Sequence, residues 1–357
     1  MKKVLKVVAL SVGTVLLLIA IVTLSFLVRG GAFRTVSTTS PRQCEAIELS
    51  AGSAEDLQID RMSGTALLSV LDRRGIVEGR AVKGTILSLP LGKQEPTPSP
   101  ALGSQPEDFR PHGLSLFNSE EGTQTLVVIN HALDGERIEI FERQPDQQLF
   151  DHIETLSTPL LHEPNDLVAI GPRQFYVAND SGATNGLERA GEMLFGIGLS
   201  PLIYFDGASF KIVADDLKSS GGINVSHDLS EIYVGETGGE SFRIYSLTQD
   251  GSLNGLQRTV GLQSAVDNID VDDSGDLWIA NHTNTLALIK HFGDANSPAP
   301  TQVQMLRMTK EGEVELKTVY EDDGKEFSAG SVGARFGDEL LIGSITERKL
   351  LRCRIDG

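Results

Sequence analysis

Leu126-Val127-Val128-Ile129-Asn130-His131 is a short apolar run that follows a turn and closes on two polar residues. Five further runs also follow turns, and most of them end on a polar or charged residue: Leu67-Leu68-Ser69-Val70, Phe175-Tyr176-Val177-Ala178-Asn179-Asp180, Ile232-Tyr233-Val234-Gly235-Glu236, Leu277-Trp278-Ile279-Ala280-Asn281-His282 and Leu340-Leu341-Ile342-Gly343-Ser344. Short β-strands that repeat at a period of roughly 40 to 60 residues are typical of a propeller, in which each repeat forms one blade. The sequence therefore predicts an all-β fold, a six-bladed β-propeller.

The polar residues that end these runs are the first candidates for function. If each run is the innermost strand of its blade and points along the central tunnel, the polar ends meet around one mouth of the ring. The residues that we expect at this mouth are Asn130, His131, Asn179, Asp180, Glu236, Asn281 and His282.

A separate signal stands at the N-terminus, where residues 7–28 form a stretch of 22 residues without a charge. This length spans the hydrocarbon core of a bilayer. No small-residue cleavage motif follows it, so we favour an uncleaved signal anchor over a cleaved signal peptide. Three lysines precede the stretch and only Arg29 follows it, which places the N-terminus in the cytoplasm and the rest of the chain on the periplasmic or extracellular side. We predict an anchor helix over 1–29, a flexible stalk over 30–43 and the propeller over 44–357.

Only two cysteines are present, Cys44 and Cys353, and they lie near the two ends of the exported part. In an oxidising compartment they can join the first and last strands, which is the closure that a ring of blades needs. Two unrelated thiols are the alternative. A zinc site is less consistent with the sequence, because zinc ligands usually occur at short spacing.

The formal net charge is −18, from 49 acidic and 31 basic residues. An acidic surface repels phosphates, so we expect no nucleic-acid partner. The same surface is compatible with binding of divalent cations, although acidity mostly reports solubility.

Two longer segments interrupt the repeats. Residues 93–109 contain four prolines and are expected to form a surface loop between the first two blades. Residues 181–201 are rich in glycine but also apolar. This second segment is a lid, a lipid-facing patch or packing beneath a blade, and we favour packing.

Pairs of acids and amides are the most informative local feature of the chain: Glu55-Asp56, Asn165-Asp166, Asn179-Asp180 and Asp267-Asn268, with Asn224 nearby in a fourth repeat. Calcium takes about six to eight oxygen ligands, and a mixture of carboxylates and amides supplies them without excessive negative charge. Any single pair is also an ordinary turn former. Two histidines, His112 and His131, are candidate proton acceptors or, alternatively, structural hydrogen-bonding groups.

Taken together, these residues resemble the paraoxonase/arylesterase family of six-bladed propeller lactonases, which is related to the gluconolactonase group. The similarity runs in order from Cys44 to Cys353 and includes Glu55-Asp56-Leu57, Pro111-His112-Gly113, Val128-Ile129-Asn130-His131, Asn165-Asp166, Phe175-Tyr176, Asn179-Asp180, Gly222-Ile223-Asn224, Val266-Asp267-Asn268-Ile269, Asp276-Leu277-Trp278 and Leu340-Leu341-Ile342-Gly343.

The resemblance implies two calcium sites. It implies a catalytic ion in the tunnel bound by Glu55, Asn165, Asp267 and Asn268. It also implies a buried structural ion held by Asp56, Asp166 and the backbone carbonyl of Leu114. His112 and His131 correspond to the histidine dyad of the family, and Cys44 with Cys353 to its ring-closing disulfide.

The chain departs from the family pattern at three positions. Gly221 stands where the family has an asparagine ligand directly before Gly-Ile, so Asn224 or a water molecule would have to supply the missing oxygen. Ser181 replaces a histidine, and Asn281 replaces a free cysteine before His282. We expect the last two changes to alter substrate preference more than the chemistry.

The predicted function is calcium-dependent hydrolysis of small-molecule lactones and aryl esters by a membrane-anchored enzyme. The main alternative is a membrane-anchored propeller that binds a ligand or partner without catalysis, as many propellers do. A third hypothesis keeps an enzyme that isomerises or condenses its substrate.

Overall fold

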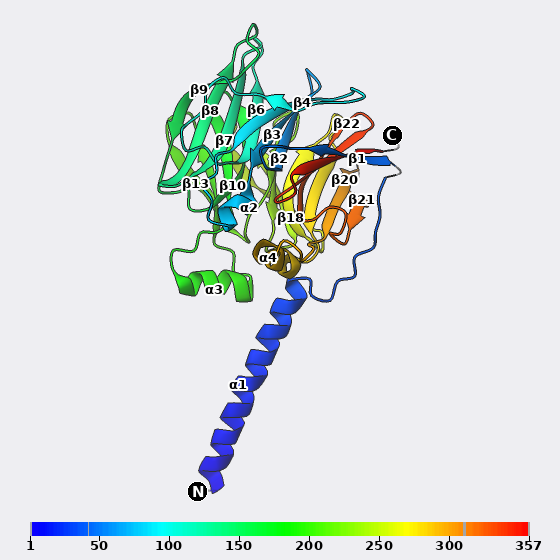
Figure 1. The fold of residues 1–357 in the computed structure, drawn as a ribbon. Helices are drawn as coiled ribbons and strands as arrows, with labels where there is room; N and C mark the ends of the chain where they lie inside the picture. The colour runs from blue at the N-terminus through cyan, green and yellow to red at the C-terminus, as the bar shows by residue number, and fades with distance from the viewer. Residues whose placement is uncertain (1, 42, 310–311, 356–357) are drawn as a thin grey trace.

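Six four-stranded antiparallel sheets stand around a common axis in the computed structural model, which describes residues 2–41, 43–309 and 312–355 (Figure 1). The strands of blades 1 to 6, each from the innermost to the outermost, are β2 (Ser53–Asp60), β3 (Thr65–Leu71), β4 (Thr85–Pro90) and β5 (Ser99–Pro100); β6 (Pro111–Asn118), β7 (Gln124–Ala132), β8 (Gly135–Arg143) and β9 (Asp151–Leu156); β10 (Pro164–Gly171), β11 (Gln174–Asn179), β12 (Ser200–Phe205) and β13 (Phe210–Leu217); β14 (Ile223–Val225), β15 (Glu231–Glu236), β16 (Ser241–Leu247) and β17 (Leu253–Gly261); β18 (Ala265–Val271), β19 (Leu277–His282), β20 (Thr301–Met308) and β21 (Val314–Asp322); β22 (Gly330–Phe336), β23 (Glu339–Ser344), β24 (Lys349–Arg354) and β1 (Gln43–Glu48). The predicted six-bladed β-propeller is confirmed.

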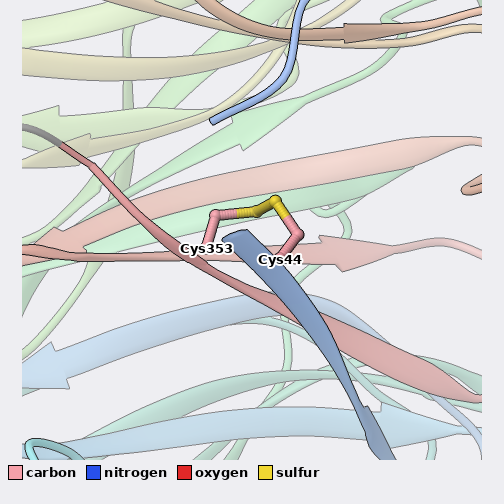
Figure 2. The surroundings of a disulfide bond; sticks show 2 residues. All are labelled: Cys44 and Cys353. Carbon is pink, nitrogen blue, oxygen red and sulfur yellow. A yellow bond between two sulfur atoms is a disulfide. The ribbon is translucent and has the colours of Figure 1, made fainter. Parts of the chain in front are cut away.

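The ring closes in blade 6, where the first strand of the propeller joins the last three. β1 pairs with β24 in a register that sets Cys44 opposite Cys353, and the two residues form a disulfide (Figure 2). The predicted bond is present. It joins residues 309 positions apart in sequence, and a crosslink across so long a loop removes much conformational entropy from the unfolded chain.

The six apolar runs are the second strands of the blades, not the innermost strands as we expected. β7 and β19, for example, each have β6 or β18 between them and the axis. A second strand is covered by neighbouring blades on both faces, so it is the most uniformly apolar strand of its sheet. The innermost strand borders the tunnel and carries polar side chains, which hides it from a search for apolar runs.

Each pair of neighbouring blades shares one buried apolar cluster. Leu126 and Val128 of blade 2, for example, pack with Leu67 and Ile86 of blade 1. The cluster between blades 6 and 1 contains Val332, Leu341 and Leu350 beside Leu57 and Val70, and the other four interfaces repeat the arrangement. The core is therefore a ring of interfaces around a polar axis.

The innermost strands are irregular where they approach one end of the axis. Register shifts interrupt the pairing in five of them, at Ala54/Asp56, Pro111/Leu114, Pro164/Asp166, Val266/Ile269 and Gly330/Val332. A bulge breaks the strict alternation of side chains and re-aims the extra residue. Four of these irregularities, in β2, β6, β10 and β18, coincide with the predicted acid–amide and histidine positions, so consecutive polar side chains can both approach the axis.

Within the described ranges, four helices accompany the propeller: α1 (Lys2–Arg29), α2 (Arg73–Val77), α3 (Gly186–Phe195) and α4 (Thr285–Gly293). α1 projects away from the ring with α3 and α4 at its base (Figure 1), and it is long and apolar enough to cross a membrane. At the end of α1, Gly31 has φ +76° and lies so close to the Thr283 carbonyl that a Cβ would be 2.2 Å from its oxygen. Only glycine fits this contact without strain.

Three segments differ from their expected roles. The stalk lies against the propeller, where Arg34 forms an ion pair with Glu240 and Thr39 pairs with Glu321. The proline-rich segment 93–109 contributes the edge strand β5, a position that tolerates proline. Within residues 181–201, Gly186–Phe195 form α3 instead of packing beneath a blade, and Met193 and Phe195 are exposed beside the end of α1.

Candidate axial active site

The same two positions recur in blades 2, 3, 4 and 5 and define the site. We call the first the inner position; it lies on or just before the innermost strand and is occupied by His112, Asn165, Gly221 and Asp267. We call the second the flanking position; it lies at or just after the end of the second strand and is occupied by His131, Asp180, Thr237 and His282. The register is the same in all four blades, because the pairs Leu114–Val128, Leu167–Val177, Ile223–Val234 and Ile269–Ile279 lie two residues after the inner position and three before the flanking one.

In three of these blades the flanking side chain contacts the inner one. The His112 and His131 rings meet edge to face with centroids 4.8 Å apart. Asn165 Nδ2 donates to Asp180 Oδ2 at 3.0 Å. His282 Nε2 lies 2.7 Å from Asp267 Oδ2. The residues that precede the flanking positions, Asn130, Asn179, Glu236 and Asn281, are buried inside their blades, so only alternate members of the predicted mouth set reach the mouth.

Glu55 and Asn268 complete the group from two innermost strands, β2 of blade 1 and β18 of blade 5. Asn268 Nδ2 donates to Glu55 Oε1 at 3.0 Å and to the Glu55 carbonyl at 3.2 Å. Both side chains are only 2% exposed. The structure thus brings together Glu55, Asn165, Asp267 and Asn268, the four side chains that the resemblance assigns to one ion.

Three oxygen atoms of this group have no hydrogen-bond partner among the described residues: Glu55 Oε2, Asn165 Oδ1 and Asn268 Oδ1. A buried polar atom without a partner is costly, so its persistence calls for an explanation. The amide NH₂ groups of both asparagines are bonded to acids, which leaves their oxygens free for a cation. Acidic and histidine side chains alone do not form a three-membered metal cluster in the described part of the chain, so the donor set depends on these amides. It is the mixture of oxygens that calcium prefers.

A second carboxylate pair, Asp56 and Asp166, lies next to the first group and is almost fully buried. Asp56 accepts backbone N–H groups from Leu57 and Leu114, each at 2.8 Å. Asp166 accepts those of Leu167 and Ile223 at 2.7 and 2.8 Å. Two neighbouring buried carboxylates repel each other, which a cation between them would relieve.

Burial changes the protonation of these acids. Burial raises the pKa of Glu55 to about 8, and the charges of Asp267 and Asp166 add to the increase while Arg73 opposes it. The pKa of Asp166 is likewise raised to about 8 by burial, against the effect of its two backbone N–H donors. The pKa of Asp56 also rises well above its usual range, first through burial and then through Asp166 and Glu55. Glu55 and Asp166 therefore hold protons at neutral pH.

Arg73, in the first turn of α2, reaches the same site, although no motif in the sequence marks it. Its Nη2 donates to the Pro111 carbonyl at 3.1 Å and lies 3.4 Å from His112 Nδ1 and 3.7 Å from Glu55 Oε2. A guanidinium only donates, so we assign His112 Nδ1 as the unprotonated nitrogen and Nε2, 3.5 Å from Glu55 Oε2, as the protonated one. Burial, His131 and Arg73 lower the pKa of His112 well below its usual value. His112 is therefore neutral at pH 7.

His131 connects this histidine to the outside of the site. Its Nδ1 lies 2.5 Å from Glu136 Oε2, and about a third of its side chain is exposed, compared with 18% for His112. The pair leads from the buried axis to solvent, as a proton path requires.

Asn224 does not join the ligand group in this structure. Its Nδ2 donates to the Ile269 carbonyl at 2.7 Å, and its Oδ1 accepts the N–H of Val225. It stands beside Gln58 and Asp270, in the passage toward the opposite end of the tunnel. Blade 4 brings its backbone to the axis instead, since a Cβ on Gly222 would lie 2.4 Å from the Asp267 carbonyl oxygen.

A cavity of about 260 Å³ opens over the mouth. Its walls come from the last turn of α1, from α3 and α4 and from the blade 4 loop, and Asp180 and Thr237 lie at its base. Arg29 at the end of α1 donates to the Met193 carbonyl of α3 at 3.3 Å. α1 is thus part of the wall of this cavity.

Sequence reasoning missed roles for Arg73, Thr237 and His282. His282 ended a recognisable run and could have been paired with Asp267 once the register was known. Arg73 follows a strand in an arginine pair, a pattern that usually lies on the surface.

Comparisons with known proteins show the family and the fold. The family model described as Arylesterase matches residues 37–355. The chain is 30% identical over 332 residues to serum paraoxonase/arylesterase 1 of Mus musculus, covering 91% of this chain and 93% of that protein. It is 29% identical over 357 residues to serum paraoxonase/lactonase 3 of Homo sapiens, covering 98% and 99%.

Two solved structures share the fold. A luciferin-regenerating enzyme superposes with a TM-score of 0.55 at 14% identity, covering 88% of this chain and 96% of that one. A gluconolactonase from Xanthomonas campestris superposes with a TM-score of 0.51 at 14% identity, covering 91% and 99%. At such identities the likeness concerns the propeller alone.

Proposed function

Since this chain belongs to the arylesterase family, we propose that its axial site hydrolyses lactones and aryl esters with calcium bound in the tunnel. The observation that carries the proposal is the set of three buried oxygens, Glu55 Oε2, Asn165 Oδ1 and Asn268 Oδ1, that accept no hydrogen bond from the described residues. Glu55 Oε2 has only the longer ion-pair contacts with Arg73 and His112. They come from three different strands and accompany a fourth donor, Asp267, as a binding site for a hard cation would require.

Glu55, Asn165, Asp267 and Asn268 would hold the catalytic ion, and Asp56, Asp166 and the Leu114 carbonyl would hold a structural one. When bound, calcium supplies Lewis-acid stabilisation of the negative charge that develops on the ester or lactone carbonyl oxygen. The residues of the chain provide the rest. Asp180 orients Asn165, and His282 orients Asp267, through the hydrogen bonds described above.

His112 is the proposed general base. Its low pKa keeps the imidazole neutral, and it would accept a proton from the attacking water once the Nδ1 lone pair, which faces Arg73 Nη2 at 3.4 Å in this structure, is released. The His131 ring contacts the His112 ring and would pass the proton on toward Glu136, which lies closer to solvent.

The substrate would enter through the cavity between α1, α3 and α4. This entrance lies at the end of the propeller from which α1 departs (Figure 1), so an anchored enzyme would open toward the bilayer surface. We propose that the propeller lies on the periplasmic or extracellular side, where the disulfide would persist.

Gly221 is the observation that favours the runner-up, a propeller that binds calcium and a ligand without turnover. A panel of lactones and aryl esters, assayed with the detergent-solubilised full chain, separates the two. We expect turnover in millimolar calcium and a loss of about 10²- to 10³-fold after removal of calcium, the size expected when the group that stabilises an oxyanion is lost. Tight calcium binding with no turnover on any member of the panel would favour the runner-up.

A further inference from the structure

Blade 4 breaks the pattern of the other three blades that contribute an inner and a flanking side chain. Its inner position is Gly221, which has no side chain, and its flanking position is Thr237. We propose that the Thr237 hydroxyl supplies the blade 4 oxygen of the axial cation site, in place of a side chain at position 221. This inference rests on the proposed calcium site.

The Thr237 hydroxyl lies close to the position that a side chain at residue 221 would occupy. A Cβ built on Gly221 would lie 2.9 Å from Thr237 Oγ1, 3.2 Å from the Val266 carbonyl oxygen and 3.6 Å from the Cα of Asp267. The hydroxyl therefore lies directly beside the place where an inner side chain of blade 4 would begin. That place is next to Asp267, one of the four candidate ligands.

The hydrogen bonds of Thr237 leave its hydroxyl oxygen free to act as an acceptor. Thr237 Oγ1 donates to the Val266 carbonyl at 2.6 Å, which uses its only proton. The two lone pairs of a hydroxyl remain for an acceptor role, and a hydroxyl oxygen is a hard donor of the kind that calcium accepts. The backbone N–H of Thr237 donates to the Ser219 carbonyl at 2.8 Å, so the residue is held from both sides.

Thr237 also shares a cavity with a residue that contacts a candidate ligand. Thr237 lines the mouth cavity together with Asp180, the flanking residue of blade 3. Asp180 holds the amide of Asn165, whose Oδ1 has no partner among the described residues. The Thr237 hydroxyl thus stands between two ligand-bearing blades, and it closes the gap in the ring of donors that Gly221 leaves.

Calcium titration of the full chain in detergent, by calorimetry after chelator treatment, tests the assignment. We expect Thr237→Ala to weaken the axial site by about 10- to 100-fold, as removal of a metal-supporting group typically does. Thr237→Ser keeps the hydroxyl and should retain the affinity. Thr248→Ala, in an exposed turn of blade 4, is the matched control and should leave both sites unchanged.

A double variant tests whether a side chain at position 221 can replace the Thr237 hydroxyl. In Gly221→Asn alone, the new side chain collides with the Thr237 hydroxyl and should not strengthen binding. In Gly221→Asn with Thr237→Ala, the collision is removed and the affinity should recover toward the original value. The calorimetric readout does not depend on any substrate.

The outcomes separate this inference from the proposed function. Unchanged calcium affinity in both Thr237→Ala and the isosteric Thr237→Val, in a chain that binds calcium, overturns the assignment of Thr237 and leaves the proposed site intact. A native chain that binds no calcium contradicts both. Should Thr237→Ala fail to fold, Thr237→Val decides the question alone.

Discussion

Replacing His112 with glutamine is expected to lower lactone and aryl ester turnover by about 10²- to 10⁴-fold, the usual contribution of a general base. Glutamine has nearly the same size and can still donate and accept hydrogen bonds, but it cannot take a proton from water. The measurement is kcat for the best substrate of the panel in saturating calcium.

Folding should survive this substitution, because His112 is half-buried and belongs to no apolar cluster. The matched control is His162→Gln. His162 is exposed and lies just before β10, the innermost strand of blade 3, and its side chain is not part of the axial group described above. Equal turnover in His112→Gln and in the native chain would remove His112 from the role of base. Unchanged melting temperature and calcium affinity would show that a loss of turnover concerns the chemistry.

Calcium is expected to stabilise the fold by about 4 kcal/mol at a concentration near 1,000 times its dissociation constant. For a domain of this size, that gain corresponds to a rise in melting temperature of roughly 5–10 °C. Thermal unfolding with calcium and with a strong chelator measures it. Asp166→Asn should reduce the gain, whereas Asp146→Asn, an exposed loop residue, should not.

The gain should depend on pH in a direction that the pKa shifts fix. Glu55 and Asp166 have pKa values raised to about 8, so the cation-free fold binds more protons than the unfolded chain between about pH 4 and pH 8. Their contribution to stability is present below pH 4 and is lost as the pH rises through 8. Calcium replaces those protons, so its stabilising effect should grow between pH 5 and pH 8. A melting temperature indifferent to calcium across this range would contradict both ion sites.

The fold was predictable because second strands buried between two blades read as nearly continuous apolar runs. The same property misled the finer assignment, since the innermost strands carry Glu55, Asn165 and Asp267 and have little apolar signal. Helix and strand propensities also could not show that apolar side chains within residues 181–201 are exposed, because their exposure depends on where α1 ends. The ring closure followed from the scarcity of cysteine and is confirmed.

The proposed ligand set came only from the resemblance to a family, and it stays a prediction that the crystals described below would test. Arg73 and Thr237 were not predictable, because their side chains reach the axis through a helical turn and a strand end whose directions depend on the register of each blade. The common register of blades 2 to 5 makes both the pattern and its exception at Gly221 visible. Asn224, chosen from the sequence as a substitute donor, instead bonds to backbone groups of Ile269 and Val225.

Crystals of the protein grown in millimolar calcium, measured by anomalous diffraction, test the central claim most directly. We expect two axial peaks: one among Glu55, Asn165, Asp267 and Asn268, and one between Asp56 and Asp166. An axis without either peak, with Glu55 and Asp267 turned away from each other, would contradict the account.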